Sequence, residues 1–99
     1  MARLIYSDRA LRDLERLSNF LIESDPLAAI ETFALIEEAV RITTRHPYIG
    51  RPVGKHIRGL IISRGRSGYI AKYDVDEREN VVRLLAIRHQ REVGLLVAF

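Results

Sequence analysis

The sequence predicts one α+β domain with the element order β-α-α-β-β-β. Two observations carry this prediction. Between residues 8 and 45, apolar side chains recur at helical spacing behind helix-capping residues. Between residues 57 and 87, three β-prone runs are separated by short polar connections. A length of 99 residues, 47% of them hydrophobic and 29% charged, fits a single globular domain spanning residues 1–99.

The first two expected elements are a short strand over residues 3–6 and a helix over residues 8–23. Ser7 and Asp8 provide a helix cap and an acidic first turn. The apolar side chains then follow one helical stripe: Ala10, Leu14, Leu17 and Leu21. Most charged residues of this segment, with Asp13 counted among them, are expected largely outside that stripe.

A second helix is expected from Pro26 to about Arg45. Asp25 suits the cap position, and Pro26 suits the first helical position because its missing N–H group would have no partner there. Apolar residues recur at helical spacing along the segment: Ala29, Phe33, Ile36 and Val40. Because almost no linker separates the two helices, they should form an antiparallel αα-hairpin.

The segment 46–54 contains two prolines and two glycines and is expected to be a loop. Strands should follow over residues 57–63, 69–75 and 81–87, joined as an antiparallel three-strand meander. In the middle strand, Tyr69 and Tyr73 share the face that should pack under the helices. We expect core packing for both rings with their hydroxyls bonded at the edge, and a catalytic or base-stacking role is the alternative.

The predicted architecture is therefore an N-terminal αα-hairpin packed on an antiparallel sheet, since neither layer can hide its apolar side alone. The apolar tail, residues 93–99, either packs back on this body or binds a partner.

The sequence lacks the common signatures of cofactor and metal chemistry. It has no cysteine, no GxGxxG fingerprint and no P-loop. Its histidines, His46, His56 and His89, are not at ligand spacing from one another. We therefore expect no metal and no cofactor. No stretch approaches the roughly 20 apolar residues of a membrane span, so we expect a cytoplasmic protein without a membrane partner.

Positive charge is concentrated in the second half of the chain. Residues 1–49 carry six Lys/Arg and eight Asp/Glu, whereas residues 50–99 carry ten and five. The expected hairpins could bring several basic residues onto one surface that binds a target or partner: Arg58, Arg64, Arg66, Arg83, Arg88, His89 and Arg91. Such a surface could hold phosphates or receive the carboxylates of a peptide. Solvated strand ends protected by charge are the alternative.

Several motifs in order resemble the RelE/ParE superfamily, the small toxins of bacterial type II toxin–antitoxin modules. They are Asp25-Pro26-x-Ala28-Ala29, the loop Pro47-x-x-Gly50-Arg51-x-Val53, the spacing Tyr69-x-x-x-Tyr73-x-Val75, and the late run Leu84 to Arg91. The resemblance covers nearly the whole chain and implies the same β-α-α-β-β-β fold.

The resemblance implies one of two activities. RelE-like members cleave messenger RNA on the ribosome without a metal, and ParE-like members inhibit DNA gyrase by binding. For cleavage, the candidate catalytic residues are His89 and Arg91. Departures from the RelE-like pattern favour the ParE branch: Lys55 is the lone lysine of the middle loop, and no tyrosine follows Tyr73. We therefore expect a gyrase-binding toxin that is not an enzyme.

The resemblance also implies a partner. The family's toxins are neutralised by a cognate antitoxin whose C-terminal segment wraps the toxin, as a helix over the αα-hairpin and an extended piece along the sheet. A basic sheet half would attract an acidic segment, and broad apolar helix faces would suit an amphipathic helix. A different interaction role, or a family member that is no longer toxic, is the remaining alternative.

Overall fold

The computed structural model describes residues 1–64 and 67–89, with the side chains of residues 63, 64 and 67 outside the description. It confirms the α+β fold. The elements are β1 (Arg3–Tyr6), α1 (Asp8–Ser24), α2 (Pro26–Ile42), β2 (Arg51–Gly54), β3 (Ile57–Arg64), β4 (Ser67–Asp76) and β5 (Val81–His89). The predicted apolar tail, residues 93–99, lies outside the described residues.

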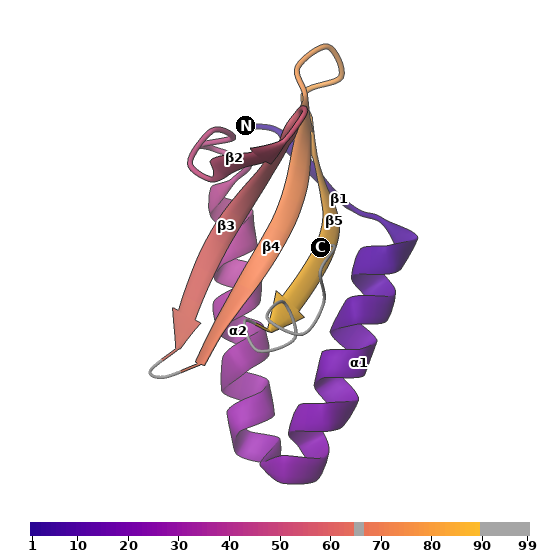
Figure 1. Cartoon of the computed structure of the whole chain (residues 1–99), viewed down its shortest axis with the longest axis vertical. Coiled ribbons are helices and arrows are strands. Elements are labelled where there is room, and N and C mark those ends of the chain that lie inside the picture. The colour runs from indigo at the N-terminus through magenta and orange to yellow at the C-terminus, as the bar shows by residue number, and fades with distance from the viewer. Residues whose placement is uncertain (65–66, 90–99) are drawn as a thin grey trace.

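Both helices begin where the capping residues predict. The Ser7 hydroxyl accepts a hydrogen bond from the Ala10 amide at the start of α1, and the Asp25 carboxylate accepts one from the Ala28 amide at the start of α2. Pro26 occupies the first turn of α2. The two helices form the predicted αα-hairpin, which extends past the lower end of the sheet in Figure 1.

The sheet has five strands in the order β1-β5-β4-β3-β2, one more than the sequence indicated. The extra strand, β2, lies in the segment expected to be a loop and pairs antiparallel with β3 through an irregular register. Pro52 is tolerated there because β2 is an edge strand. The β3-β4-β5 meander is antiparallel as predicted, but β1 pairs with β5 in parallel, so the sheet is mixed.

The core lies between the hairpin and one face of the sheet. Tyr69, Ala71 and Tyr73 of β4 are buried under the helices, which confirms the predicted facing of this strand. Val82 and Leu84 of β5 complete that layer. In Figure 1, α2 lies behind the sheet and α1 lies along its β5 side, and no helix among the described residues covers the front face.

Helix α1 replaces β1 as the neighbour of β5. The strand β1 pairs only with Val81 to Leu84, and the chain then turns into α1, which runs beside the rest of β5. The backbone edge left by β1 is satisfied from this segment: the Ser7 amide donates to the Leu84 carbonyl and the Ser7 hydroxyl to the Leu85 carbonyl. The cap of α1 therefore also fixes the helix against the sheet.

Candidate functional site

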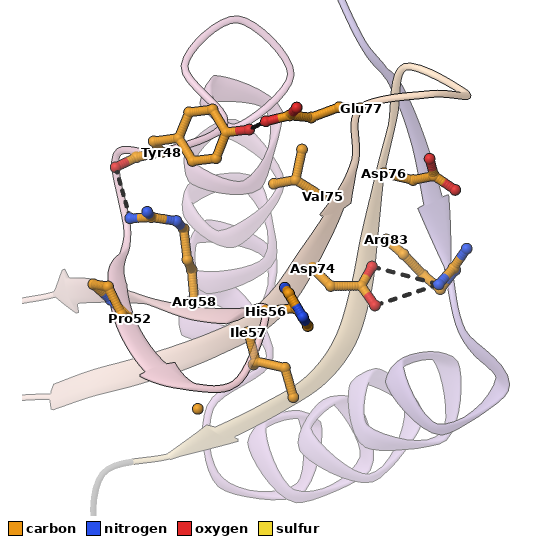
Figure 2. A pocket seen from close by; sticks show the side chains of 11 residues that line it. Tyr48, Pro52, His56, Ile57, Arg58, Asp74, Val75, Asp76, Glu77 and Arg83 are labelled. Carbon is orange, nitrogen blue, oxygen red and sulfur yellow. Dashed lines mark hydrogen bonds and ion pairs between the residues drawn. The ribbon is translucent and has the colours of Figure 1, made fainter.

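A pocket of about 680 Å³ opens where the β2–β3 turn meets the end of β4 and the start of β5. Figure 2 shows its side chains converging from these strands and from the loop that precedes β2. The lining residues are Tyr48, Pro52, Gly54, His56, Ile57, Arg58, Asp74, Val75, Asp76, Glu77 and Arg83. Two of the predicted binding residues, Arg58 and Arg83, are thus brought to one pocket.

Arg58 is held by the loop before β2. Its Nη1 donates to the Gly50 carbonyl at 2.6 Å and to the Tyr48 carbonyl at 3.2 Å, and its guanidinium lies 4.8 Å from the centroid of the Tyr48 ring. The Tyr48 hydroxyl is hydrogen-bonded in turn to the Glu77 carboxylate. One wall of the pocket is therefore formed by Arg58 and Tyr48, which hold each other in place.

Arg83 is paired across the sheet with an acid. It lies opposite Asp74 in the β4–β5 register, and its Nη1 is 3.3 Å from Asp74 Oδ2 and 3.5 Å from Oδ1. Figure 2 shows both contacts. With Asp76 and Glu77 also in the wall, the pocket carries three carboxylates and two guanidinium groups. Its formal charge is negative, in contrast to the basic surface that the sequence suggested.

The loop that carries Tyr48 is fixed by Tyr73. The Tyr73 hydroxyl donates to the Pro47 carbonyl at 2.7 Å and accepts from the Gly50 amide at 2.9 Å, so the predicted edge bond is confirmed for this ring. A Cβ at Gly50 would lie 2.8 Å from Tyr73 Oη and 2.9 Å from the Gly59 carbonyl oxygen. Burial raises the pKa of Tyr73 above its ordinary value of 10.0, partly opposed by the Gly50 amide and Arg58.

Arg88 has a role inside the fold. Its Nη1 lies 2.5 Å from Asp13 Oδ1, and the other oxygen of Asp13 accepts from the Ile87 amide at 3.0 Å. The side chains of Arg88 and Asp13 are only 12% and 5% exposed. Asp13 therefore belongs to the buried side of α1, which corrects its placement outside the apolar stripe. The prediction of Arg88 as a surface contact is corrected in the same way.

The remaining predicted residues divide into two groups. His89 ends β5 with its ring edge-on to Tyr69, at 5.1 Å between centroids. In the β4–β5 register, His89 pairs with Tyr69 and Arg88 pairs with Ile70. Both pairs lie at the opposite end of β4 from Asp74, roughly 15 Å from the pocket along the strand. Arg66 and Arg91 lie outside the described residues, as does the side chain of Arg64. Of the described members of the expected basic surface, Arg58 and Arg83 therefore lie at one end of the sheet and Arg88 and His89 at the other.

Sequence reasoning missed Asp13 and Asp74 as partners of these arginines. Asp13 lies three residues after Ala10 and four before Leu17, a spacing that places a carboxylate on the buried helix face. The pairing of Asp74 with Arg83 depends on a register shift between Lys72 and Tyr73, which no local sequence pattern reveals. Within residues 1–64 and 67–89, no group of three potential metal ligands occurs. None of the helices described there is long and apolar enough to cross a membrane.

A second surface lies on the hairpin and the β1 edge. Four large apolar side chains near the hairpin tip are more than half exposed: Phe20, Ile22, Leu27 and Ile30. Away from the tip, the C-terminal half of α2 and the start of the chain around β1 line a further pocket of about 860 Å³. Because Arg3 and Ser7 donate their amides toward β5, the intervening Leu4 and Tyr6 direct their backbone groups to the outer edge of β1.

Residues 4–94 match the model of the ParE toxin of the type II toxin–antitoxin system parDE. The chain belongs to the ParE toxin family. Among curated relatives, it is 40% identical to Toxin RelE1 of Caulobacter vibrioides over 71% of this chain and 75% of that protein. It is 33% identical to Toxin RelE3 of the same species over 85% of this chain and 89% of that one.

Two solved structures are similar to this chain in fold, although their sequences are only distantly similar to it. A chain of the chromosomal ParDE system from P. aeruginosa has a TM-score of 0.73 at 21% identity, over 88% of this chain and 94% of that chain. A chain of the intact E. coli RelBE toxin–antitoxin complex has a TM-score of 0.61 at 18% identity, with the same coverage. These likenesses confirm the fold, which ParE-named and RelE-named proteins share.

Proposed function

We propose that this ParE-family toxin inhibits DNA gyrase by binding it, and that a cognate antitoxin neutralises the toxin. The observation that carries the proposal is the state of the arginines. In the pocket, Arg58 contacts two backbone carbonyls and Arg83 contacts Asp74. Side chains engaged in this way suit a preformed docking surface better than a set of cations waiting for a phosphate.

The chemistry of RNA cleavage supports the same preference. Attack of a ribose 2′-OH on its phosphate needs a general base, a general acid and cations for the developing charge. The pocket is lined by one histidine, His56, an exposed residue of the β2–β3 turn. The neighbouring carboxylates oppose accumulation of negative charge.

A RelE-like, ribosome-dependent messenger RNA endoribonuclease is the second candidate. The curated relatives named Toxin RelE1 and Toxin RelE3 favour it. In that case, His89 and Arg91 are the candidate catalytic residues, and Arg64 and Arg66 would contact the RNA.

The two candidates separate in paired assays with purified chain. We expect inhibition of gyrase-catalysed supercoiling and no messenger RNA cleavage in a reaction that contains ribosomes. Growth arrest on expression should be accompanied by a DNA-damage response. A His89→Ala variant should remain toxic, because docking needs no proton transfer. Ribosome-dependent cleavage that is lost in His89→Ala would reject gyrase inhibition in favour of the endoribonuclease.

The exposed apolar side chains of the hairpin support the antitoxin partner. They fit the apolar face of an amphipathic helix, and the outer edge of β1 offers backbone groups to an extended segment. The similar chain from E. coli is part of an intact RelBE toxin–antitoxin complex.

The antitoxin surface can be tested with the product of a gene adjacent to this one. Leu27→Gln with Ile30→Gln should weaken its binding at least tenfold in calorimetry and leave the urea midpoint nearly unchanged, because both side chains are exposed. Ile61→Gln is the control, since Ile61 is also exposed but lies on β3. Equal binding by all three proteins would place the antitoxin elsewhere.

A further inference from the structure

The Asp74–Arg83 pair is not explained by stability. The two side chains are 26% and 43% exposed, and their contacts of 3.3 and 3.5 Å are long for an ion pair. Pairs with this exposure contribute little to folding. The pair does limit what Arg83 can offer to a ligand, because both Asp74 oxygens contact its Nη1 and their negative charge would repel a phosphate oxygen there.

Asp74 differs from the other two acids of the pocket in its partner. Asp76 accepts the Glu79 amide within the β4–β5 turn, and Glu77 is bonded to the Tyr48 hydroxyl. Asp74 is the carboxylate placed directly against a guanidinium group. Removal of its charge would leave two arginines and two carboxylates around the pocket, with Arg83 free to turn toward a phosphate.

We propose that Asp74 is a specificity-determining residue that excludes nucleic acid from this pocket by occupying Arg83. A nucleic acid brings a continuous row of phosphates, whose binding depends on cations that can pair with them. A protein surface brings charges of both signs and can satisfy Arg58, Arg83 and the carboxylates together. The pocket therefore selects a protein partner, which deepens the proposed function and rests on it for the identity of that partner.

The test measures binding of a fluorescein-labelled single-stranded oligouridylate by fluorescence anisotropy. Asp74→Asn should bind at least fivefold more tightly than the wild-type chain at about 50 mM salt. One additional phosphate contact should also steepen the slope of log affinity against log salt concentration by about 0.7 for a single strand. A merely structural role for Asp74 would not produce that change in slope.

Three further variants complete the experiment. Asp76→Asn removes the same charge from the same pocket and should change affinity less than twofold. Asp74→Ser should reproduce the effect of Asp74→Asn, and comparable urea midpoints will show that both are folded. Asp74→Asn combined with Arg83→Gln should return to the wild-type affinity and slope, because the gain acts through Arg83.

The results separate this inference from the proposed target. If Asp74→Asn and Asp74→Ser gain no affinity, if Asp76→Asn gains as much, or if the double variant keeps the gain, the inference is overturned. Inhibition of gyrase by the wild-type chain is read independently. A chain that fails to inhibit gyrase, while Asp74→Asn gains RNA affinity through Arg83, rejects the target and retains the role of Asp74.

Discussion

At the scale of single residues, the loop before β2 depends on the absence of a side chain at position 50. Gly50→Ala would drive a methyl group against the Tyr73 hydroxyl and the Gly59 carbonyl. Because overpacking of this kind displaces neighbouring atoms, we expect the free energy of unfolding to fall by about 2 kcal/mol in urea titration. Gly54→Ala is the matched control, since a Cβ at Gly54 would lie 3.9 Å from its nearest neighbour, Ile57 Cβ. Equal effects at the two glycines would contradict this account.

The Tyr73 hydroxyl should make stability dependent on alkaline pH. Its pKa is raised in the folded protein, so above pH 10.0 the unfolded chain binds fewer protons than the folded one. Stability is therefore fully present below that pH and is lost as the pH rises toward the folded pKa. Tyr73→Phe should lower stability by about 1–2 kcal/mol at pH 8, through two lost hydrogen bonds, and flatten the alkaline decline. Urea midpoints between pH 8 and 11 measure both effects, and an unchanged decline would contradict the prediction.

Tyr6 should contribute to the same decline. Its pKa is raised chiefly by burial and also by Glu37, with Arg41 acting in the opposite direction. The raised pKa of Tyr6, like that of Tyr73, lowers the free energy of unfolding as the pH rises above 10.0. Tyr6→Phe should therefore also flatten the decline of stability with pH. At pH 8, the stability lost in Tyr73→Phe but not in Tyr6→Phe measures the two hydrogen bonds of the Tyr73 hydroxyl.

Arg88 should matter for folding before it matters for binding. Arg88→Met would leave the carboxylate of Asp13 buried with one ion-pair partner fewer, and breaking a buried pair in this way costs about 3 kcal/mol. Arg16 contacts the same Asp13 oxygen at 2.9 Å with a side chain that is 42% exposed, so Arg16→Met should cost under about 1 kcal/mol. Chemical unfolding of the two variants makes the comparison. A loss of toxicity in Arg88→Met without a loss of stability would return Arg88 to the binding surface.

At the scale of elements, Ser7 joins α1 to the sheet. Its hydroxyl caps the helix and also donates to the Leu85 carbonyl at 3.1 Å. The exposed Asp25 caps α2 without such a link. We therefore expect Ser7→Ala to lower the free energy of unfolding by about 2 kcal/mol and Asp25→Ala by about 1 kcal/mol. If Asp25→Ala cost as much as Ser7→Ala, the hydroxyl would act as a cap alone.

The elements also indicate where sequence reasoning succeeds. The two caps and the tyrosine spacing in β4 are local signals, and each predicted its structure correctly. The four-residue strand β2 was missed because its Pro and Gly content is that of a loop, and only pairing with β3 makes it a strand. The α2 helix ends at Ile42, before the predicted Arg45, because Thr43 and Thr44 form the closing turn with backbone bonds to Val40 and Arg41.

Contacts between residues far apart in the sequence limit how much of the candidate site could be predicted. Arg58 and Arg83 could be predicted to lie near one another from strand order, but the carbonyl partners of Arg58 and the carboxylate partner of Arg83 could not. The Arg88–Asp13 contact joins residues 75 positions apart, so no local pattern contains it. The register shift between Lys72 and Tyr73 is likewise a tertiary feature, and it determines which charges meet across β4 and β5.

At the scale of the whole molecule, the described elements should unfold together. The strand β5 contacts β1, β4 and α1, so no described layer keeps its buried face when β5 is removed. We expect one cooperative urea transition, with coincident midpoints for far-UV circular dichroism and tyrosine fluorescence. A hairpin signal that persists after the sheet signal is lost would show that the two layers are separate units.

The parallel pairing of β1 with β5 has a consequence for synthesis on the ribosome. The partners of Arg3 to Tyr6 are Val81 to Leu84, so the first strand emerges long before its neighbour exists. Contacts of such separation slow folding, because a long loop must close before they form. Nascent chains that stop short of β5 cannot complete the sheet. The cell is therefore exposed to a finished molecule only after β5 has been made, which leaves time for an antitoxin already present to meet the chain as it closes.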